Sequence, residues 1–443
     1  MFVPDYRTLA DRVAADIAAG RLHPGDRLPT QRRFARRRGI AVSTAARVYA
    51  ELTRRGLVVG EVGRGTFVRA APPAPGPALA EPSTALVDLE LNFPSPPEQP
   101  ALLSAAITAL SRPDVLAEAL APVGVRGSSA LRAAAAEALA RPGWQPDPDD
   151  LLITGSGRQA IAAAFAALVP TGGRIAVEAL TYPLVRGAVH RLGLTAVPLR
   201  LDDEGLVPAA LDAACREAPV HVLSVQPTLH NPLGVTMGAR RRAELAEVLR
   251  EHDVVAVEDA VYSFLRPEPG PLAAHAPERT IVIESLSKRL APGLTLGFAA
   301  CPPALVDRVA AAARSGGWTP QGLAVAAAIR WLTDGTASRL VEIKRADAAA
   351  RQELARAHLP GLRADPAAYH AWLPLPEPWR AETFVAAAAR RGIAVTPAAA
   401  FAVIPAHAPD AVRLALAAPP LPVLREALDT LAALLRTDPD LPD

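Results

Sequence analysis

The stretch that decides the fold reads ESLSKRLAPGLTLG and covers residues 284–297. It follows an apolar run, Ile281 to Ile283, that predicts a buried strand. The chain has 47 basic residues, and only two of them, Lys288 and Lys344, are lysines. A lysine kept in a chain that otherwise uses arginine indicates a role that a guanidinium cannot fill. An amine can lose its proton and attack a carbonyl carbon, whereas an arginine stays charged.

Lys288 therefore has two interpretations. It can form a Schiff base with pyridoxal phosphate, a reaction that needs an amine. Alternatively, it is a lysine that happens to follow a strand. The polar residues at the ends of other strands bear on this choice.

Length and composition bound the class of protein. A chain of 443 residues predicts two or three domains, and 50% hydrophobic residues allow a large core. No apolar run reaches the length of a membrane span and no signal peptide opens the sequence, so we expect a cytoplasmic protein without membrane contact. Two cysteines, Cys215 and Cys301, make neither a disulfide framework nor a metal-ligand set.

Charge is unevenly distributed along the chain. Residues 1–70 hold fourteen Arg and six acidic residues, a net charge of +8. The whole chain carries +2, so the remaining residues carry −6. A basic head on an acidic body predicts that the head meets nucleic acid.

The head shows three helical segments and a ribbon. Residues 6–19 have helical apolar spacing, and residues 22–29 predict a turn-rich link. Thr30 is a predicted N-cap for a helix over residues 31–38. A third helix is predicted from Ser43 or Thr44 to about residue 55. Two helices around a Gly-containing turn, followed by a Gly-rich ribbon at 57–68, are typical of DNA-binding domains.

The head resembles the GntR-type winged helix. The family pattern stands here as Gly20, Pro24-Gly25-Asp26-Arg27-Leu28-Pro29, Ser43-Thr44 and Gly63-Arg64-Gly65-Thr66-Phe67-Val68. The resemblance implies that residues 1–69 bind a double-stranded DNA operator.

Candidate DNA contacts follow from position. Ser43, Thr44 and Arg47 open the third helix, where side chains reach base edges. Phosphate or minor-groove contacts are predicted for Arg32, Arg33 and the wing residues Arg64, Gly65 and Thr66. The alternative for the arginine run, and for Arg36 to Arg38 individually, is a solvated face.

A Pro-rich linker, residues 70–85, is predicted between the head and a body at 86–443. In the body, Ala-rich helical stretches alternate with β-branched runs at 151–154, 174–178, 220–225, 254–258, 280–284 and 297–301. This alternation predicts an α/β domain with a mostly parallel sheet, followed by a smaller α+β subdomain from about residue 335. Ligands bind at the carboxyl ends of the strands in such sheets, and the polar motifs fall there.

Each of these motifs is ambiguous by itself. Residues 154–160 form a Gly-rich turn before a helix, which can hold a phosphate but is common. Tyr182 can be packing, Asn231 an ordinary Asn-Pro turn, and Asp259 a helix N-cap. Their order along the chain is more specific: phosphate turn, aromatic, Asn-Pro, Asp with Tyr three residues on, then Ser-x-Ser-Lys.

That order resembles the fold type I pyridoxal-phosphate enzymes, the aminotransferase family, from about Leu89 to about Ala418. With its GntR-like head, the whole chain is identified as similar to MocR-family regulators. The resemblance implies pyridoxal 5'-phosphate as cofactor and a homodimer.

The resemblance also implies residue roles. Lys288 would form the Schiff base, and Asp259 would pair with the pyridinium N–H. Asn231 and Tyr262 would bond the phenolic oxygen of the ring, and Tyr182 would stack on it. The phosphate would be held by Ser156, Gly157, the backbone of Arg158 and Gln159, Ser285 and Ser287. Arg413, inside an apolar strand, would clamp the carboxylate of a substrate or effector, the alternative being a pair with a structural acid.

Two departures from the family pattern matter. Thr295 stands where the family has an Arg that bonds the phosphate, so Arg158 or Arg289 is a candidate to supply the charge. Residues 121–126 also lack the Tyr that usually reaches the cofactor of the partner subunit. The departures favour cofactor binding over efficient transamination.

Three functions remain open from the sequence. The first is a transcription regulator that senses pyridoxal phosphate or an amino compound through an external aldimine, which shifts the dimer and its DNA contacts. The second is a working aminotransferase tethered to DNA. The third is a regulator whose body has lost the cofactor and serves as a dimerisation module.

Overall fold

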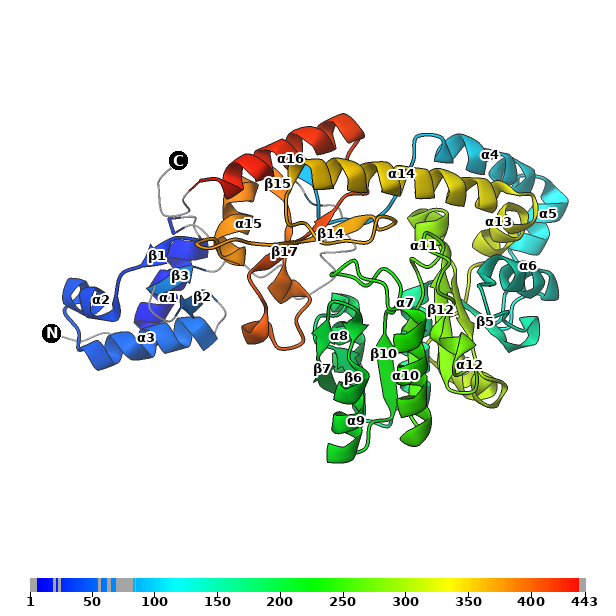
Figure 1. Cartoon of the computed structure of the whole chain (residues 1–443), viewed down its shortest axis with the longest axis horizontal. Helices are drawn as coiled ribbons and strands as arrows, with labels where there is room; N and C mark the ends of the chain where they lie inside the picture. Colours follow the sequence, from blue (N-terminus) through cyan, green and yellow to red (C-terminus); the bar gives the residue numbers. More distant parts are fainter. Residues whose placement is uncertain are drawn as a thin grey trace.

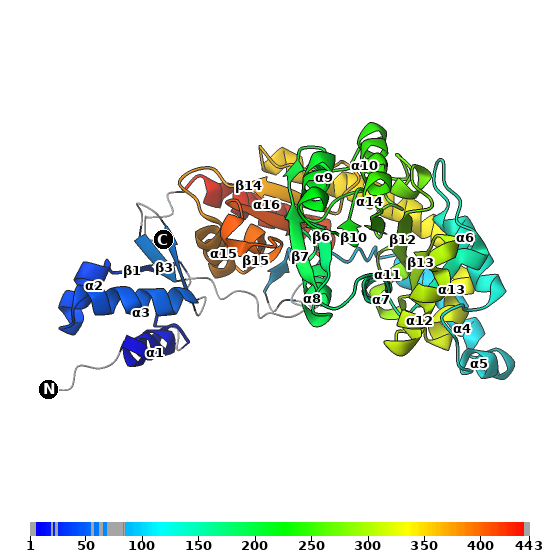
Figure 2. The same ribbon diagram turned by 90° about the horizontal axis from the view of Figure 1, so that it is seen from below.

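The computed structural model describes residues 6–18, 21–22, 25–54, 57–61, 65–68, 83 and 85–437. A small N-terminal head lies at one end of a larger body (Figures 1 and 2). The head comes close to the body at Gly25, where an added Cβ would lie 3.6 Å from the Cβ of Ala386. Among helices in the described ranges, none is long and apolar enough to cross a membrane.

The head contains three helices and a three-stranded sheet. The helices are α1 (Tyr6–Ala18), α2 (Gln31–Arg38) and α3 (Val42–Arg54). The sheet has the order β1 (Arg27–Leu28), β3 (Gly65–Val68), β2 (Val58–Glu61). The predicted N-cap is confirmed, since the Thr30 hydroxyl accepts from the Arg33 amide at 3.3 Å. The tip of the predicted Gly-rich ribbon at 62–64, and residues 70–82 and 84 of the predicted linker, lie outside the described residues.

One prediction for the head is wrong. Residues 22–29 were expected to lack regular structure, but Arg27 and Leu28 form β1 and pair antiparallel with Phe67 and Thr66. A strand of two residues carries no readable periodicity. Its existence depends on β3, which is distant in the sequence.

The body is built on a seven-stranded sheet. Its order is β5 (Leu151–Thr154), β13 (Gly297–Ala300), β12 (Thr280–Ser285), β11 (Val255–Asp259), β10 (Val222–Val225), β6 (Arg174–Glu178), β7 (Thr195–Leu199). Only β13 runs antiparallel to its neighbours among these strands. The six predicted strands are confirmed to within two residues. The edge strand β7 was missed, because it is half-exposed and includes Pro198, which weakens the strand signal.

Helices cover both faces of this sheet (Figure 1). They are α6 (Ser129–Leu139), α7 (Gly157–Leu168), α8 (Pro183–Arg191), α9 (Pro208–Glu217), α10 (Ala239–Glu251), α12 (Val306–Ser315) and α13 (Gly322–Thr333). Two further helices, α4 (Gln99–Leu110) and α5 (Pro113–Ala119), pack on α13. The strands β5, β10, β12 and β13 are buried along their whole length, as expected for a sheet covered on both sides. A short antiparallel pair, β8 (Leu201–Asp202) and β9 (Gly205–Leu206), follows β7.

A smaller C-terminal subdomain packs beside the sheet. It contains the antiparallel strands β14 (His370–Pro374), β17 (Ala411–Ala415) and β16 (Thr396–Pro397), with helices α15 (Ala381–Arg390) and α16 (Leu421–Leu435). The long helix α14 (Thr336–His358) leads into it from the sheet domain. This subdomain also takes in β4 (Val87–Asp88), which pairs in parallel with β15 (Ile393–Ala394). The sequence did not predict that β4, at the start of the body, joins the C-terminal subdomain.

Candidate cofactor site

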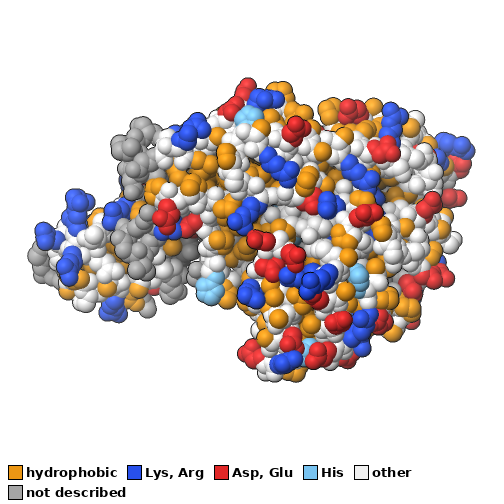
Figure 3. Space-filling model, viewed as in Figure 1, with side chains coloured by type: hydrophobic (Ala, Val, Ile, Leu, Met, Phe, Trp, Pro, Cys, Tyr) orange, Lys and Arg blue, Asp and Glu red, His pale blue; other side chains and the backbone are white. Residues whose placement is uncertain are grey.

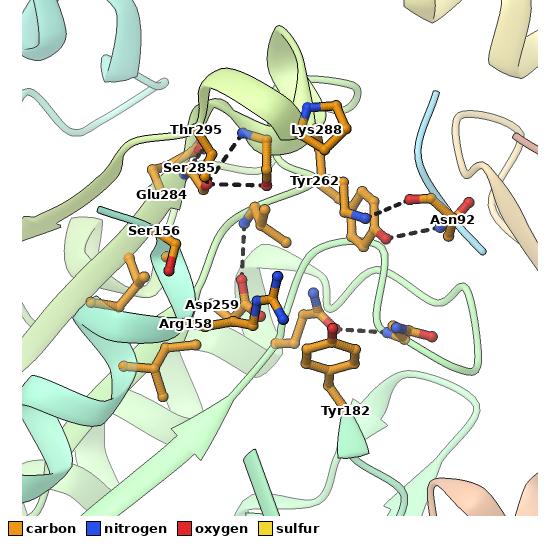
Figure 4. Close-up of a pocket in the computed structure, with 18 of the residues that line it drawn as sticks. Asn92, Ser156, Arg158, Tyr182, Asp259, Tyr262, Glu284, Ser285, Lys288 and Thr295 are labelled. Carbon is orange, nitrogen blue, oxygen red and sulfur yellow. Dashed lines mark hydrogen bonds between the residues drawn. The ribbon is translucent and has the colours of Figure 1, made fainter. Parts of the chain in front are cut away.

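A cavity lies between the carboxyl ends of the sheet strands, the start of α7 and strand β17 (Figure 4). Its empty volume, counted out to its mouth, is about 810 Å³. The residues that line it come from both parts of the body, because Lys288 follows β12 whereas Arg413 lies on β17. A site of this kind at the strand ends is the usual ligand position in open α/β sheets.

Lys288 lies on the four-residue helix α11 (Leu286–Arg289), which follows β12 directly. Its Nζ donates to the carbonyl oxygen of Asn92 at 2.5 Å and lies 3.2 Å from the centroid of the Phe93 ring. Burial lowers the pKa of Lys288 well below its ordinary value, the charges of Arg413 and Arg158 lower it further, and Asp259 opposes them. A buried amine that loses its proton easily is a ready nucleophile.

Asp259 is the last residue of β11, the neighbour of β12 in the sheet. Burial raises its pKa to about 7, although a hydrogen bond from the Val261 amide at 3.1 Å acts in the other direction. A carboxyl group in this state gains most from a ligand that brings an N–H donor or a positive charge.

The turn before α7 offers a set of donors suited to a phosphate. Ser156 caps the helix, and its hydroxyl accepts from the Gln159 amide at 3.3 Å. Across the turn, Ser285 Oγ donates to Ser287 Oγ at 3.1 Å and lies 3.0 Å from Thr295 Oγ1. Several hydroxyls and the positive end of a twelve-residue helix therefore converge on one end of the cavity.

Gly297 permits this convergence. A Cβ at Gly297 would lie 2.3 Å from the backbone carbonyl of Ser156, which is a clash. The glycine lets β13 approach the turn closely, and so brings the turn against Ser285 and its neighbours.

The two arginines that were candidates to replace the missing family Arg have different surroundings. Arg289 is buried and donates from Nη2 to Glu284 Oε1 at 3.2 Å. The same carboxylate oxygen accepts from Arg141 Nη2 at 2.8 Å and from Ser263 Oγ at 2.7 Å. Arg158 instead lines the cavity. Arg289 is therefore occupied by a structural ion pair, and Arg158 is the arginine available to a ligand phosphate.

Aromatic and amide groups lie on the other side of the cavity. Tyr262 accepts a hydrogen bond from Asn92 Nδ2 at 2.8 Å, and burial raises its pKa. The backbone N–H of Asn231 donates to Gln226 Oε1 at 2.8 Å. Asn231 Oδ1 is buried without a hydrogen-bond partner among the described residues. Such an orphaned atom at a cavity wall indicates a ligand that supplies the missing partner.

Arg413 is fully buried on β17, and burial lowers its pKa. Its Nη2 donates to the Glu90 carbonyl at 2.5 Å and to Thr396 Oγ1 at 3.0 Å, and its guanidinium lies 5.3 Å from the Phe401 ring centroid. Glu90 contributes its backbone oxygen and not its carboxylate. Among the described residues, no carboxylate forms a salt bridge with Arg413. The alternative interpretation, an arginine paired with a structural acid, is therefore not supported.

The structure brings together nearly all the predicted site residues. The cavity is lined by Ser156, Gly157, Arg158, Tyr182, Asn231, Asp259, Tyr262, Ser285, Ser287, Lys288 and Arg413. Gln159 does not line it, and its amide is already bonded to Ser156. Sequence reasoning missed Asn92, Phe93 and Gln226, which also line the cavity. Asn92 and Phe93 carry no local motif, and only the tertiary fold brings them to Lys288.

The predicted DNA-contacting residues lie on the head. Arg32, Arg33, Ser43 and Arg47 are exposed, whereas Thr44 is half-buried. Basic side chains are spread over the outer part of the head in Figure 3. The Arg47 guanidinium lies 4.2 Å from the Tyr6 ring centroid, so it also packs on α1. In the wing, Gly65 has φ +134° and Thr66 pairs with Leu28, whereas Arg64 lies outside the described residues.

Known families match both parts of the chain. Residues 87–431 match the family described as Aminotransferase class I and II, and residues 5–68 match Bacterial regulatory proteins, gntR family. The HTH-type transcriptional regulator YdeF of Bacillus subtilis is 30% identical over 97% of this chain and 95% of its own length. The vitamin B6 salvage pathway transcriptional repressor PtsJ of Salmonella typhimurium is 30% identical over 85% of this chain and 87% of its own.

Solved aminotransferases share the fold of the body. Thermus thermophilus aspartate aminotransferase tetra mutant 1 aligns with a TM-score of 0.69 and 25% identity, over 80% of this chain and 97% of that one. Pyrococcus horikoshii kynurenine aminotransferase aligns with a TM-score of 0.73 and 23% identity, over 80% of this chain and 91% of that one.

Proposed function

This chain belongs to the MocR family of transcriptional regulators, which join a gntR-family head to an aminotransferase-like body, and we propose that its body binds pyridoxal phosphate in the cavity around Lys288. The observation that carries the proposal is the buried Lys288 amine with a lowered pKa, in one cavity with Asp259 and the start of α7. The name of the relative PtsJ, a repressor of vitamin B6 salvage, supports a ligand of this class.

The chemistry of the cavity fits the cofactor. Lys288 offers the amine that would hold it covalently, and Asp259 offers a carboxylate for its ring nitrogen. Ser156, Arg158, Ser285 and Ser287 offer hydroxyls and a positive charge for the phosphate, and the side-chain amide of Asn231 offers an N–H donor for the phenolic oxygen of the ring. Bound there, the cofactor supplies an electrophilic carbon and an electron sink for an amino compound.

The effector is an amino compound that carries a carboxylate. Arg413 is fully buried at the cavity and keeps a buried Nε without a partner within the described residues. A carboxylate bound to it by two parallel hydrogen bonds would compensate the cost of burying the guanidinium. Pyridoxal phosphate itself is the second candidate for the regulatory signal.

The head would transmit the signal to DNA. A homodimer in the cytoplasm would place two heads on two half-sites of an operator, so a change in the arrangement of the bodies alters affinity. An effector achieves this only if it binds one arrangement more tightly than the other.

The test is the visible absorbance spectrum of the full chain after addition of pyridoxal phosphate, for the wild type and for Lys288→Ala. We expect a visible band in the wild type that the variant lacks, and a spectral change when amino acids are added. Without cofactor, Lys288→Ala should unfold at the wild-type temperature or above it, because the change removes a buried amine whose pKa is lowered by burial. The absence of a band in the wild type would contradict cofactor binding and favour a dimerisation module.

Operator binding, measured by fluorescence anisotropy with and without the amino compound, tests the regulatory part. The wild type is expected to change its operator affinity, whereas Lys288→Ala is not. Release of a keto acid at many turnovers per protein would instead support a working aminotransferase.

A further inference from the structure

The second lysine of the chain is not on the surface. Lys344 has no exposed area and lies on the long helix α14. Its Nζ donates to the backbone carbonyl of Lys288 at 2.8 Å and to that of Leu290 at 2.8 Å. The chain has 45 arginines and two lysines. The two lysines are in direct contact, through a hydrogen bond from the side chain of Lys344 to the backbone of Lys288.

The contact falls at the end of the short helix that bears Lys288. Helix α11 has four residues, and a helix leaves its last carbonyls without partners inside the helix. The carbonyls of Lys288 and Leu290 are of this kind. The Leu290 amide closes the turn by donating to the Leu286 carbonyl at 2.7 Å. A lysine ammonium at the end of such a turn satisfies both carbonyls and is favoured by the negative end of the helix.

Helix α14 carries this contact toward the C-terminal subdomain. It contacts both α11 and α16. The Tyr369 hydroxyl lies 2.8 Å from both the Lys344 carbonyl oxygen and Asp347 Oδ2, and its one proton is shared between these two acceptors. Further along, Arg351 donates to the carbonyls of Leu416 and Pro419, both at 2.7 Å. The turn that bears Lys288 is thus tied to a helix that is anchored in the subdomain bearing Arg413.

We propose that Lys344 is a positioning residue for Lys288, which caps the α11 turn and couples its orientation to helix α14. The role of this coupling in ligand sensing rests on the proposed function above. Lys344 does not touch the cavity itself, so it acts through the backbone of the Lys288 turn.

A lysine suits this position better than an arginine would. Three rotatable donors on a compact ammonium can reach two carbonyls of one turn, whereas a guanidinium needs more space. Arg289 and Asp347 are the charged groups that act on Lys344 here, and burial lowers its pKa to about 7. The amine keeps enough protons for both hydrogen bonds on either side of that pH.

The experiment compares Lys344→Met with a matched control, Arg351→Met. Arg351 is a second buried cation on the same helix. It donates to two carbonyls of the subdomain and to Asp347 Oδ2 at 2.8 Å, and none of these partners belongs to the Lys288 turn. Hydrogen exchange of the Leu290 and Leu286 amides is measured in the full chain without cofactor. Pyridoxal phosphate is then titrated, and the visible band gives the half-saturation concentration.

We expect Lys344→Met to speed exchange of the Leu290 amide and to raise the half-saturation concentration, each by about tenfold. Arg351→Met should lower the thermal midpoint. It should change neither the exchange rate of the Leu290 amide nor the half-saturation concentration by more than about twofold. Lys344→Gln keeps hydrogen-bond donors, so its exchange rate and half-saturation concentration should lie between those of the wild type and Lys344→Met. It also replaces Lys344→Met if the Met variant does not fold.

Equal effects of the two Met variants, or an unchanged Leu290 amide in Lys344→Met, would overturn the inference. A wild type without a visible band would instead refute the proposed cofactor. The exchange comparison needs no cofactor and would still decide whether Lys344 positions the Lys288 turn.

Discussion

Lys288 and Asp259 reach the cavity from the ends of two adjacent strands, and burial changes their pKa values in opposite directions. Burial disfavours the charged form of each, so the amine loses its proton more easily and the carboxyl group holds its proton more tightly. Each group is then suited to a partner that the protein lacks by itself. When the cavity holds no ligand, the burial of these two groups lowers the free energy of unfolding.

That cost makes Asp259→Asn a stabilising change without cofactor. The pKa of Asp259 is about 7 in the folded chain, against an ordinary 3.8. Because the folded pKa is raised, stability falls as the pH rises from 3.8, where the unfolded chain releases its proton, and the loss is complete above about pH 7. We expect the variant to exceed the wild type in free energy of unfolding at pH 8 by up to roughly 4 kcal/mol.

Denaturant unfolding at pH 5 and pH 8 checks this expectation. The advantage of the variant should shrink at pH 5, and the variant should bind pyridoxal phosphate more weakly than the wild type. An advantage of the same size at both pH values would contradict the assigned titration.

Arg158 is expected to supply the phosphate charge that Thr295 does not. Arg158→Ala removes a charged hydrogen bond worth about 1.5–3 kcal/mol, which corresponds to a roughly 10- to 100-fold loss of pyridoxal-phosphate affinity. Arg158→Lys, the matched control, keeps the charge and should lose much less. Titration of the visible band measures both, and unchanged affinity in Arg158→Ala would exclude Arg158 from this role.

Among the elements, the pair α2 and α3 depends on one glycine. Gly39 ends α2 with φ 62°, in the left-handed region, and its amide bonds back to the last turn of the helix. A side chain there meets no atom within 4 Å, so the only penalty of substitution is backbone strain. The angle between the two helices, and so the presentation of Ser43 and Arg47, rests on this turn.

Gly39→Ala is expected to destabilise α2 by about 1 kcal/mol, because alanine is strained at positive φ. Gly60→Ala on β2 is the matched control, since Gly60 also has open space around it but is not at positive φ. Native-state hydrogen exchange of the α2 amides in the full chain measures the difference. Equal exchange in the two variants would show that the turn is not strained by a side chain.

At the scale of the whole molecule, the chain consists of a basic head and an acidic body with different properties. The head carries exposed arginines, and the body encloses the cavity around Lys288. We expect the charge on the head to add affinity for any duplex, and the residues that open α3 to add sequence preference.

The double variant Arg32→Ala, Arg33→Ala is expected to weaken operator binding and to reduce its salt dependence. Each lost phosphate contact lowers the slope of log affinity against log salt by about 0.9, so the double variant should lose about 1.8. Arg314→Ala, an exposed arginine on α12 of the body, serves as the control. Anisotropy titrations from low to moderate salt measure the slope. An unchanged slope in the double variant would assign these arginines to a solvated face.

Much of the fold was predictable because long elements carry strong periodic signals. The six strands of the sheet, Thr30 as a cap and the stretch around Lys288 were all readable in this way. The two-residue strands β1 and β4 were not, because each needs a distant partner, β3 for Arg27–Leu28 and β15 for Val87–Asp88. The edge strand β7 was missed because its exposed residues and Pro198 obscure the apolar pattern.

The sequence by itself determined the two-part architecture, the family, and the residue types that end each strand. Local patterns suffice for these, since turns, caps and buried strands are written in neighbouring residues. Only the tertiary structure decided which charges are free for a ligand. Arg158 faces the cavity while Arg289 pairs with Glu284, and Lys344 caps the Lys288 turn from 56 residues away. Burial and partners set the chemistry of a charged side chain, and both come from residues that are far apart in the chain.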